Sequence, residues 1–254
     1  MTPARLSLVT IAAFALAPAA LAQAAPENSL AFGFALVPDY DGSADYSLRP
    51  AINGSFSFGD VTLDLRGTGL RADLIAGPVA AGPVLNYRFG RSSDVDNPQV
   101  AALPETEDAL ELGAFVSVPL NGTVALSADL LADVSGTHDG VLASLSADWR
   151  QPVSDRMAVF ASASVSAMDA NFAQTYYGIT AAGAAASGLP AYAPGGGLRD
   201  AGLTLGASYD LTDRTTLTAA IGYRRLLGDA ADSPIVQAGD RDQMTLRLGL
   251  GWAF

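Results

Sequence analysis

The chain has 254 residues, no cysteine, one histidine and a formal net charge of −12 at pH 7. The missing cysteines exclude a disulfide framework and any thiolate metal site. The 26 acidic residues outnumber the 14 basic ones, which argues against a nucleic-acid partner, because a phosphate backbone attracts a basic surface.

The first residues predict a secretory signal peptide. A short start containing Arg5 precedes the apolar run 11–22, whose last three residues form a small-x-small cleavage signal. We expect cleavage between Ala22 and Gln23. Two weaker cleavage sites follow Ala17 and Ala24. A membrane anchor is the alternative, but the run is shorter than the ~20 residues that span a bilayer as a helix.

Segments that alternate apolar with polar or small residues recur along the rest of the chain. This period of two is typical of β-strands with one apolar face, and most segments approach the ~9–11 residues of a tilted membrane strand. In chain order they cover residues 30–36, 47–58, 61–65, 81–89, 110–118, 124–130, 141–149, 157–165, 203–209, 217–223 and 244–254.

The connections between these segments largely alternate between short and long. The short ones are 57–60, 121–122, 151–156 and 210–214, and the long ones are 38–46, 91–108, 133–140, 167–200 and 226–242. Short periplasmic turns and long external loops are typical of membrane barrels. The sequence therefore predicts an all-β fold, a transmembrane antiparallel β-barrel over residues 23–254. A soluble periplasmic sandwich is the alternative.

One further strand is needed to keep the neighbours antiparallel. Residues 61–70 and 81–89 would otherwise run in the same direction, so we predict a return strand over 70–77 and a turn over 78–82. Its alternation is poor. Including it gives twelve strands with both ends in the periplasm, and ten strands is the alternative.

Charged and polar residues share one phase of the alternation. A charge facing lipid at mid-depth costs ~2–4 kcal/mol, so we expect this set to face the lumen. Its members are Asp64, Arg66, Asn86, Arg88, Asp129, Asp148, Thr245 and Arg247. Aromatic residues near strand ends predict two interfacial girdles. They are Phe56, Phe58, Tyr87, Phe89, Trp149, Tyr209, Tyr223, Trp252 and Phe254.

Signals for catalysis are scarce. His138 lies in a loop beside Asp139, and a triad would need Ser135 or a distant serine. We expect a solvated loop histidine instead. The acidic loop 94–98 lacks the spacing of a calcium loop, and Gly195–Gly197 lie in a loop rather than a phosphate cradle. We therefore predict no catalytic residue, no metal ligand and no cofactor.

Five stretches resemble the MipA/OmpV family of outer-membrane proteins, also called MltA-interacting proteins. They are P-D-Y-D-G-S (38–43), Y-R-F-G-R (87–91), T-Y-Y-G-I (175–179), S-G-L-P-A-Y-A-P-G-G-G-L (187–198) and R-L-L-G-D-A-A-D-S-P-I-V (225–236). The stretch after Arg91 departs from the family pattern, because the usual Gly-rich segment is missing. Most of the matches fall in long loops, which suggests a shared plug or surface shape.

The resemblance implies an outer-membrane barrel without known catalytic activity. A founding member of the family was named as a scaffold that joins a lytic murein transglycosylase to a bifunctional penicillin-binding protein. This implies a scaffold of the Gram-negative cell envelope, with outer-membrane lipid and the barrel-assembly machinery as further partners. A narrow channel for small solutes is the alternative, and a barrel hydrolase that depends on His138 is a third reading.

Two groups of residues are candidates for roles beyond the barrel wall. The loop residues Arg225, Asp229, Asp232 and Ser233 could form a polar cluster at the rim, as a structural clamp or as a ligand site. The terminal aromatic residues Trp252 and Phe254 resemble the C-terminal signal by which outer-membrane barrels are recognised for insertion.

Overall fold

The computed structural model describes residues 28–75 and 77–254. The predicted cleavage site at Ala22 and Gln23 lies outside the described residues and stays a prediction. The strands are β1 (Asn28–Pro38), β2 (Tyr46–Phe58), β3 (Val61–Arg66), β4 (Gly69–Asp73), β5 (Ala80–Arg88), β6 (Ala109–Pro119), β7 (Val124–Asp133), β8 (Val141–Ser154), β9 (Met157–Met168), β10 (Gly197–Thr212), β11 (Thr215–Leu226) and β12 (Asp242–Ala253). The helices are α1 (Pro98–Ala101), α2 (Ala170–Tyr177), α3 (Ala181–Ser187), α4 (Gly228–Asp232) and α5 (Pro234–Gln237).

The twelve strands form one closed barrel in which every strand pairs with its sequence neighbours and β1 pairs with β12. All pairs are antiparallel, and Ser29 of β1 lies opposite Ala253 of β12. This confirms the predicted antiparallel barrel and the count of twelve rather than ten. Closure matters because it leaves no sheet edge along the paired wall.

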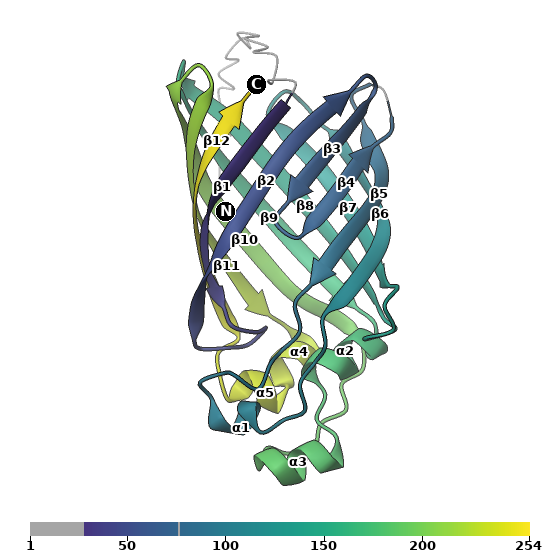
Figure 1. Cartoon of the computed structure of the whole chain (residues 1–254). Helices are drawn as coiled ribbons and strands as arrows, with labels where there is room; N and C mark the ends of the chain where they lie inside the picture. The colour runs from purple at the N-terminus through teal and green to yellow at the C-terminus, as the bar shows by residue number, and fades with distance from the viewer. Residues whose placement is uncertain (1–27, 76) are drawn as a thin grey trace, which may run out of the picture.

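The return strand between β3 and β5 is confirmed, but its predicted bounds were wrong. It covers Gly69–Asp73 rather than 70–77. Gly67 turns the chain with a positive φ of 60°, a conformation that glycine adopts without steric cost. A tight turn at residues 67–68 therefore joins β3 and β4 in place of a long external loop. Both strands end before they reach the end of the barrel that carries the helices (Figure 1).

The outer surface of the barrel is apolar, as the alternation predicts. On β12 the side chains of Met244, Leu246, Leu248, Leu250 and Trp252 are all exposed. The buried apolar clusters contain residues of all five helices together with strand ends, rather than the middle of the barrel wall. The wall thus places its apolar side chains toward lipid, and its Gly, Ala and polar side chains toward the lumen.

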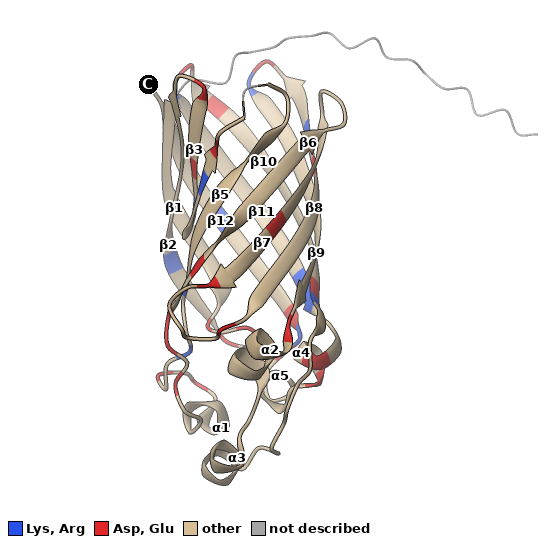
Figure 2. Cartoon of the chain, turned by 90° about the vertical axis from the view of Figure 1, so that its right-hand side faces the viewer, with Lys and Arg blue, Asp and Glu red and all other residues tan. Residues whose placement is uncertain are grey.

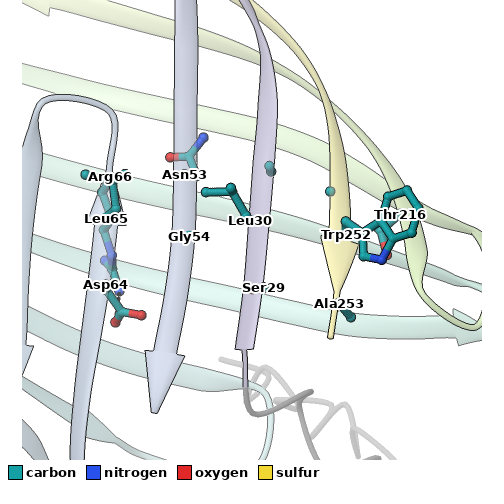
Figure 3. Close-up of a pocket in the computed structure, with 12 residues that line it drawn as sticks. Ser29, Leu30, Asn53, Gly54, Asp64, Leu65, Arg66, Thr216, Trp252 and Ala253 are labelled. Carbon is teal, nitrogen blue, oxygen red and sulfur yellow. Dashed lines mark ion pairs between the residues drawn. The ribbon is translucent and has the colours of Figure 1, made fainter. Parts of the chain in front are cut away.

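The lumen contains polar side chains that pair with one another across strands. Arg71 of β4 reaches Asp129 of β7 at 2.6 Å, and its guanidinium lies 5.1 Å from the centre of the Phe115 ring. Near the short-turn end, Asp64, Arg66 and Thr216 line a hollow of about 370 Å³ (Figure 3). Of the predicted lumen-facing charges, Asp129 thus has an ion-pair partner, and Asp64 and Arg66 lie 3.6 Å from each other.

Aromatic side chains are exposed at both ends of the barrel. Tyr87, Phe89 and Tyr223 lie at the end that bears the helices, and Trp149, Trp252 and Phe254 lie at the opposite end. This distribution fits the two predicted girdles. None of the helices among the described residues is long and apolar enough to cross a membrane.

Placing a charge on the lipid face is expected to destabilise the barrel. Leu248 of β12 is 55% exposed on that face, so Leu248→Arg should lower the free energy of unfolding in bilayers by about 2–4 kcal/mol. Ser127→Arg, a change on the lumen face near Asp129 and Asp148, is the matched control. Urea unfolding in lipid vesicles measures both, and equal losses in the two variants would contradict the assignment of faces.

Candidate functional site: the capped mouth of the barrel

The long loops gather at one end of the barrel and carry all five helices (Figure 1). We call this layer the cap. It consists of residues 39–45, 89–108, 134–140, 169–196 and 227–241. Asn28, the first described residue, and the C-terminal Phe254 lie at the opposite end, which has short turns. Figure 2 shows that many of the charged positions lie at the capped end or just inside it.

Helix α2 is the centre of the cap. The side chain of Asp169 accepts a hydrogen bond from the backbone N–H of Phe172 at 2.9 Å and so caps the N-terminus of the helix. Phe172 and Tyr177 are completely buried, in a cluster with Leu142 of β8 and Leu226 of β11. The apolar side of α2 is therefore packed against the ends of the barrel strands.

Four of the five loops are joined to one another by side-chain hydrogen bonds. The Asn97 side chain donates to the carbonyl of Ala238 at 2.8 Å, and the Asn171 side chain donates to the carbonyl of Asp139 at 2.9 Å. The Ser233 hydroxyl donates to the carbonyl of Tyr177 at 2.7 Å. These bonds join loops that are far apart in sequence, so the cap is one connected layer over the mouth of the lumen.

Beneath α2, the Asp41 carboxylate is the meeting point of two arginines. It accepts from Arg224, lies 3.7 Å from Arg199 and accepts from the Tyr177 hydroxyl at 3.1 Å. Arg199 also pairs with Asp200 at 2.6 Å. Because Arg199 and Arg224 lie on β10 and β11, this cluster ties the first loop and α2 to the barrel wall.

These arginines also decide the ionisation of Asp41. Burial alone would raise the pKa of the Asp41 carboxyl, but Arg224 and Arg199 lower it well below its usual value. A carboxyl with a lowered folded pKa stabilises the fold at every pH above its unfolded pKa, and this stabilisation is lost only as the pH falls through the folded pKa.

The cap is therefore expected to stay closed under mild acid. Because the unfolded pKa of an aspartate is near ~3.9 and the folded pKa of Asp41 is lower, acidification from neutral pH to about pH 4.5 should leave this contact intact. Planar-bilayer recordings across this range measure it. The appearance of conductance already near about pH 5.5 would contradict this role of Asp41.

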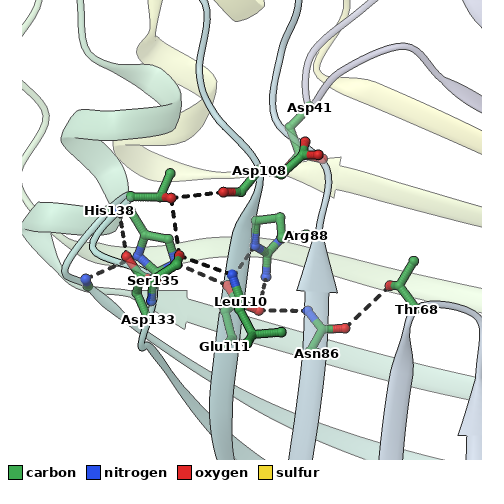
Figure 4. A network of polar contacts seen from close by, with 12 residues as sticks. Asp41, Thr68, Asn86, Arg88, Asp108, Leu110, Glu111, Asp133, Ser135 and His138 are labelled. Atoms are coloured by element: carbon green, nitrogen blue, oxygen red, sulfur yellow. Dashed lines mark hydrogen bonds and ion pairs between the residues drawn. The ribbon is translucent and has the colours of Figure 1, made fainter.

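A second polar cluster surrounds Glu111, whose side chain is completely buried. Arg88 donates to it through two nitrogens at 2.7 and 3.1 Å, Asn86 donates at 2.6 Å, and His138 lies at 3.2 Å. Figure 4 shows these three side chains converging on Glu111 from neighbouring segments. Three partners compensate a carboxylate that would be costly to bury alone.

The predicted solvated state of His138 was wrong. The side chain is 1% exposed, and its ring centre lies 5.1 Å from that of Phe172 and 5.6 Å from that of Tyr176. Its Nδ1 accepts from the backbone N–H of Gly140 at 3.0 Å, which assigns the proton to Nε2, facing Glu111. Both ring nitrogens are thus occupied, and neither is free to act as a general base.

Cationic side chains stack on the aromatic rings of α2. The guanidinium of Arg88 lies 4.9 Å from the ring centre of Phe172 and 5.7 Å from that of Tyr176. Arg199 lies 5.7 Å from the Phe172 ring. Such contacts stabilise the desolvated cations. The arrangement holds a helix in the mouth of the barrel, and the described residues include no group of three or more potential metal ligands.

The structure does not bring the four predicted rim residues together. Arg225 bonds Asp242 at 2.9 Å, Asp229 accepts from the backbone N–H of Gly195 at 2.5 Å, and Ser233 is buried at the start of α5. Asp232 contributes its backbone carbonyl to Gln237. Within the described ranges, no hydrogen bond or ion pair joins two of the four side chains, so the single rim cluster is corrected to separate loop contacts.

The glycines at 195–197 were predicted to lie in a loop, and the last of them is instead the first residue of β10. Gly195 lies in the loop and bonds Asp229, whereas Gly197 is the first residue of β10 and has a positive φ of 137°. In the acidic loop 94–98, the side chain of Asn97 caps the N-terminus of α1.

The two terminal aromatic residues have the exposure expected of an assembly signal. Trp252 is 60% exposed and Phe254 is 65% exposed. The backbone N–H of Phe254 donates to the carbonyl of Asn28 at 3.1 Å, which places the ring beside the closing seam of the barrel. Its role in insertion stays a prediction.

Deleting Phe254 is expected to impair assembly, because the last aromatic ring would be missing from the C-terminal strand. The amount of heat-modifiable, membrane-inserted protein measures this. Phe254→Tyr keeps a terminal aromatic ring and should assemble normally. A normal amount of inserted protein after the deletion would refute the signal.

The residues that hold the cap in place were missed in the sequence. Asp41, Glu111, Arg199 and Arg224 were not selected there, although Asp41 lies inside the block 38–43. Arg199 and Arg224 each directly adjoin another block. The blocks therefore contained a signal, but the partners of Asp41 are more than 130 positions away in the chain, and nothing local shows that they meet.

The comparisons with known proteins agree on the class of fold. A family model described as MltA-interacting protein MipA matches residues 30–254. The protein of Escherichia coli (strain K12) named "Putative outer membrane protein YiaT" is 31% identical over 137 residues, and the match covers 52% of each chain. The homologue of Escherichia coli O157:H7 with the same name matches equally. The chain thus spans about half the length of the curated relatives it matches.

Two porins are among the solved structures to which this chain is similar. The NanC porin has a TM-score of 0.48 at 8% identity over 89% of this chain and 100% of that chain. The KdgM porin has a TM-score of 0.45 at 7% identity over 89% and 99%. These likenesses concern the fold alone. The match of the family model over nearly the whole described barrel shows that the chain belongs to the MipA family of outer-membrane β-barrels.

Proposed function

We propose that the protein is a non-enzymatic scaffold of the Gram-negative outer membrane, exported by its signal peptide and closed to solutes by its cap. The observation that carries this proposal is the connection between the buried Tyr177 of α2 and the barrel wall through Asp41, Arg199 and Arg224. A barrel whose mouth is covered in this way offers its surfaces to partners rather than its lumen to solutes.

The partner class follows from the family description, MltA-interacting protein. It suggests a lytic transglycosylase, with a penicillin-binding protein as a further candidate. Such enzymes act on peptidoglycan and would meet the end of the barrel that carries the short turns. Three of these turns expose an aspartate, at Asp60, Asp155 and Asp213, so we expect a partner with a basic surface there.

Capture from cross-linked envelope extracts tests the scaffold. The tagged protein should recover a lytic transglycosylase, and the triple variant Asp60→Asn, Asp155→Asn, Asp213→Asn should recover several-fold less. Asp94→Asn with Asp96→Asn, in an external loop, is the matched control and should recover the normal amount. Failure of the unaltered protein to recover any murein enzyme would count against the proposal.

A narrow channel is the second candidate, favoured by the polar lumen and its Arg71–Asp129 pair. It would require the cap to move. Swelling of proteoliposomes in small sugars separates the two functions, because the scaffold predicts no swelling above that of empty liposomes. The hydrolase reading is not supported, since both nitrogens of His138 are occupied.

A further inference from the structure

The barrel wall has a seam between β2 and β5 at the capped end. The register of β2 with β3 begins at Asn53, and the carbonyl of Ile52 still accepts from the backbone N–H of Gly67 at 2.9 Å, so residues 46–51 of β2 pair with β1 alone. On the other side, the register of β5 with β4 reaches only Asn86, and the backbone N–H of Tyr87 donates to the carbonyl of Thr68 at 3.1 Å, so only Arg88 pairs with β6 alone. Because β3 and β4 are short, no strand fills this part of the wall (Figure 1).

A cavity of about 410 Å³ lies at this seam and is lined from both edges. Its lining includes Asp39, Arg49, Asn86, Arg88, Phe89 and Tyr176. A volume of ~300–1,000 Å³ is typical of small-molecule sites. The lining residues come from the first loop, β2, β5 and α2, so the cavity lies between the cap and the barrel wall.

One side chain contact bridges the seam. The guanidinium of Arg49, from β2, lies 5.4 Å from the centre of the Phe89 ring, just beyond β5. Arg49 also donates to the backbone carbonyl of Asp39 at 3.2 Å. Among residues 28–75 and 77–254, it forms no ion pair with a carboxylate. Its positive charge is thus available to a ligand in the cavity.

Besides Arg49, the cavity wall offers a hydroxyl group that has no hydrogen-bond partner. The hydroxyl of Tyr176 is buried and has no hydrogen-bond partner in the structure. A buried hydroxyl without a partner costs free energy, and a ligand oxygen at the cavity would satisfy it. Two other charges of the lining are already paired, since Arg88 bonds Glu111 and Asp41 bonds Arg224, and the Arg91 side chain donates to the carbonyl of Pro104 at 3.1 Å.

The lipid side of the same seam is apolar. Phe89, which lines the cavity, is 53% exposed, and Leu48, the neighbour of Arg49 on β2, is 67% exposed. Backbone groups without partners are costly in hydrocarbon, so an occupant of the seam must offer polar atoms inward and an apolar part outward. The Asp39 carboxylate, which also lines the cavity, favours a headgroup with a single negative charge.

We propose that this seam is a lateral binding site for an amphipathic anion, a carboxylate or phosphate on an apolar chain. The anionic group lies between Arg49 and the Tyr176 hydroxyl, and the chain lies along Leu48 and Phe89 toward the bilayer. This site is separate from the short-turn end and goes beyond the scaffold role. Its failure would leave the capture of murein enzymes unaffected.

Photolabelling of the full-length protein in nanodiscs tests the site. The probes are a long-chain carboxylate with a photoreactive group on its chain, a phosphatidate labelled in the same way, and a fatty alcohol of the same chain length. At least one acid should label residues 46–51 and 87–89, and the acid that does so distinguishes a free fatty acid from a phospholipid. The alcohol should label these segments several-fold less.

Variants separate the anion site from general contact with lipid. Arg49→Gln should lower labelling of the seam by the acid about tenfold, which corresponds to about 1.4 kcal/mol. Tyr176→Phe keeps the ring and should lower labelling several-fold. Arg150→Gln removes a lumen arginine of β8, and this control variant should be labelled as strongly as the unaltered protein. Heat-modifiability shows that each variant is folded. Labelling spread evenly around the barrel, or unchanged labelling in Arg49→Gln, would overturn the proposal.

Discussion

Replacing residues 170–196 by a short Gly-Ser linker is expected to convert a silent barrel into a steadily conducting one. The deletion removes α2 and, with it, the buried Phe172 and Tyr177 side chains that close the mouth of the lumen. The strands β9 and β10 keep their pairing, which extends through twelve register positions. Single-channel recording in planar bilayers measures the result.

A smaller deletion is the matched control for this experiment. Helix α3 lies farther from the barrel than α2 (Figure 1), and its packing partners include Leu103 and Ile179 in the outer apolar cluster. Replacing residues 181–187 by a linker of equal length should leave the bilayer silent. If the larger deletion also stays silent while the protein is folded, α2 is not what closes the lumen.

Asp41→Ala is expected to loosen the cap without unfolding the barrel. The change leaves Arg224 without its nearest carboxylate and removes the acceptor of the Tyr177 hydroxyl. Losing one partner of a buried ion pair costs about 3 kcal/mol, the lower end of the usual range, because the Asp41 side chain is still 26% exposed. Most of this cost falls on the cap, since Asp41 lies in a loop.

Hydrogen–deuterium exchange of α2 measures this loosening. About 3 kcal/mol corresponds to a roughly 100-fold faster exchange of the Ala170–Tyr177 amides, with unchanged exchange in the middle of β10. Asp45→Ala is the control, because Asp45 lies in the same loop and forms no ion pair within the described part of the chain. Equal exchange in the two variants would show that Asp41 does not hold the cap.

The wall of the barrel could be predicted from the sequence because its cause is local. Alternation along each strand follows from lipid on one side and a polar lumen on the other. The faces of Leu246, Arg247 and Leu248 can therefore be assigned without knowledge of the other strands. The shortness of β4 was less visible. Its five residues span barely two alternations, too few to fix its bounds.

The cap could not be predicted, because its cause is long-range packing. Asp41 meets Arg199 and Arg224 only when the barrel has closed and the loops have folded over it. His138 illustrates the same limit. Its neighbours in sequence are polar, which favoured a solvated side chain, but Glu111 and Phe172 bury it.

Planar-bilayer recording of the intact protein tests the central claim most directly. The claim is that the cap, held by Asp41, Arg199 and Arg224 beneath α2, closes the lumen of a MipA-family barrel. We predict that the folded, heat-modifiable protein inserts without discrete conductance steps at neutral pH. Reproducible steps from the unaltered protein would contradict the closed barrel and favour the channel.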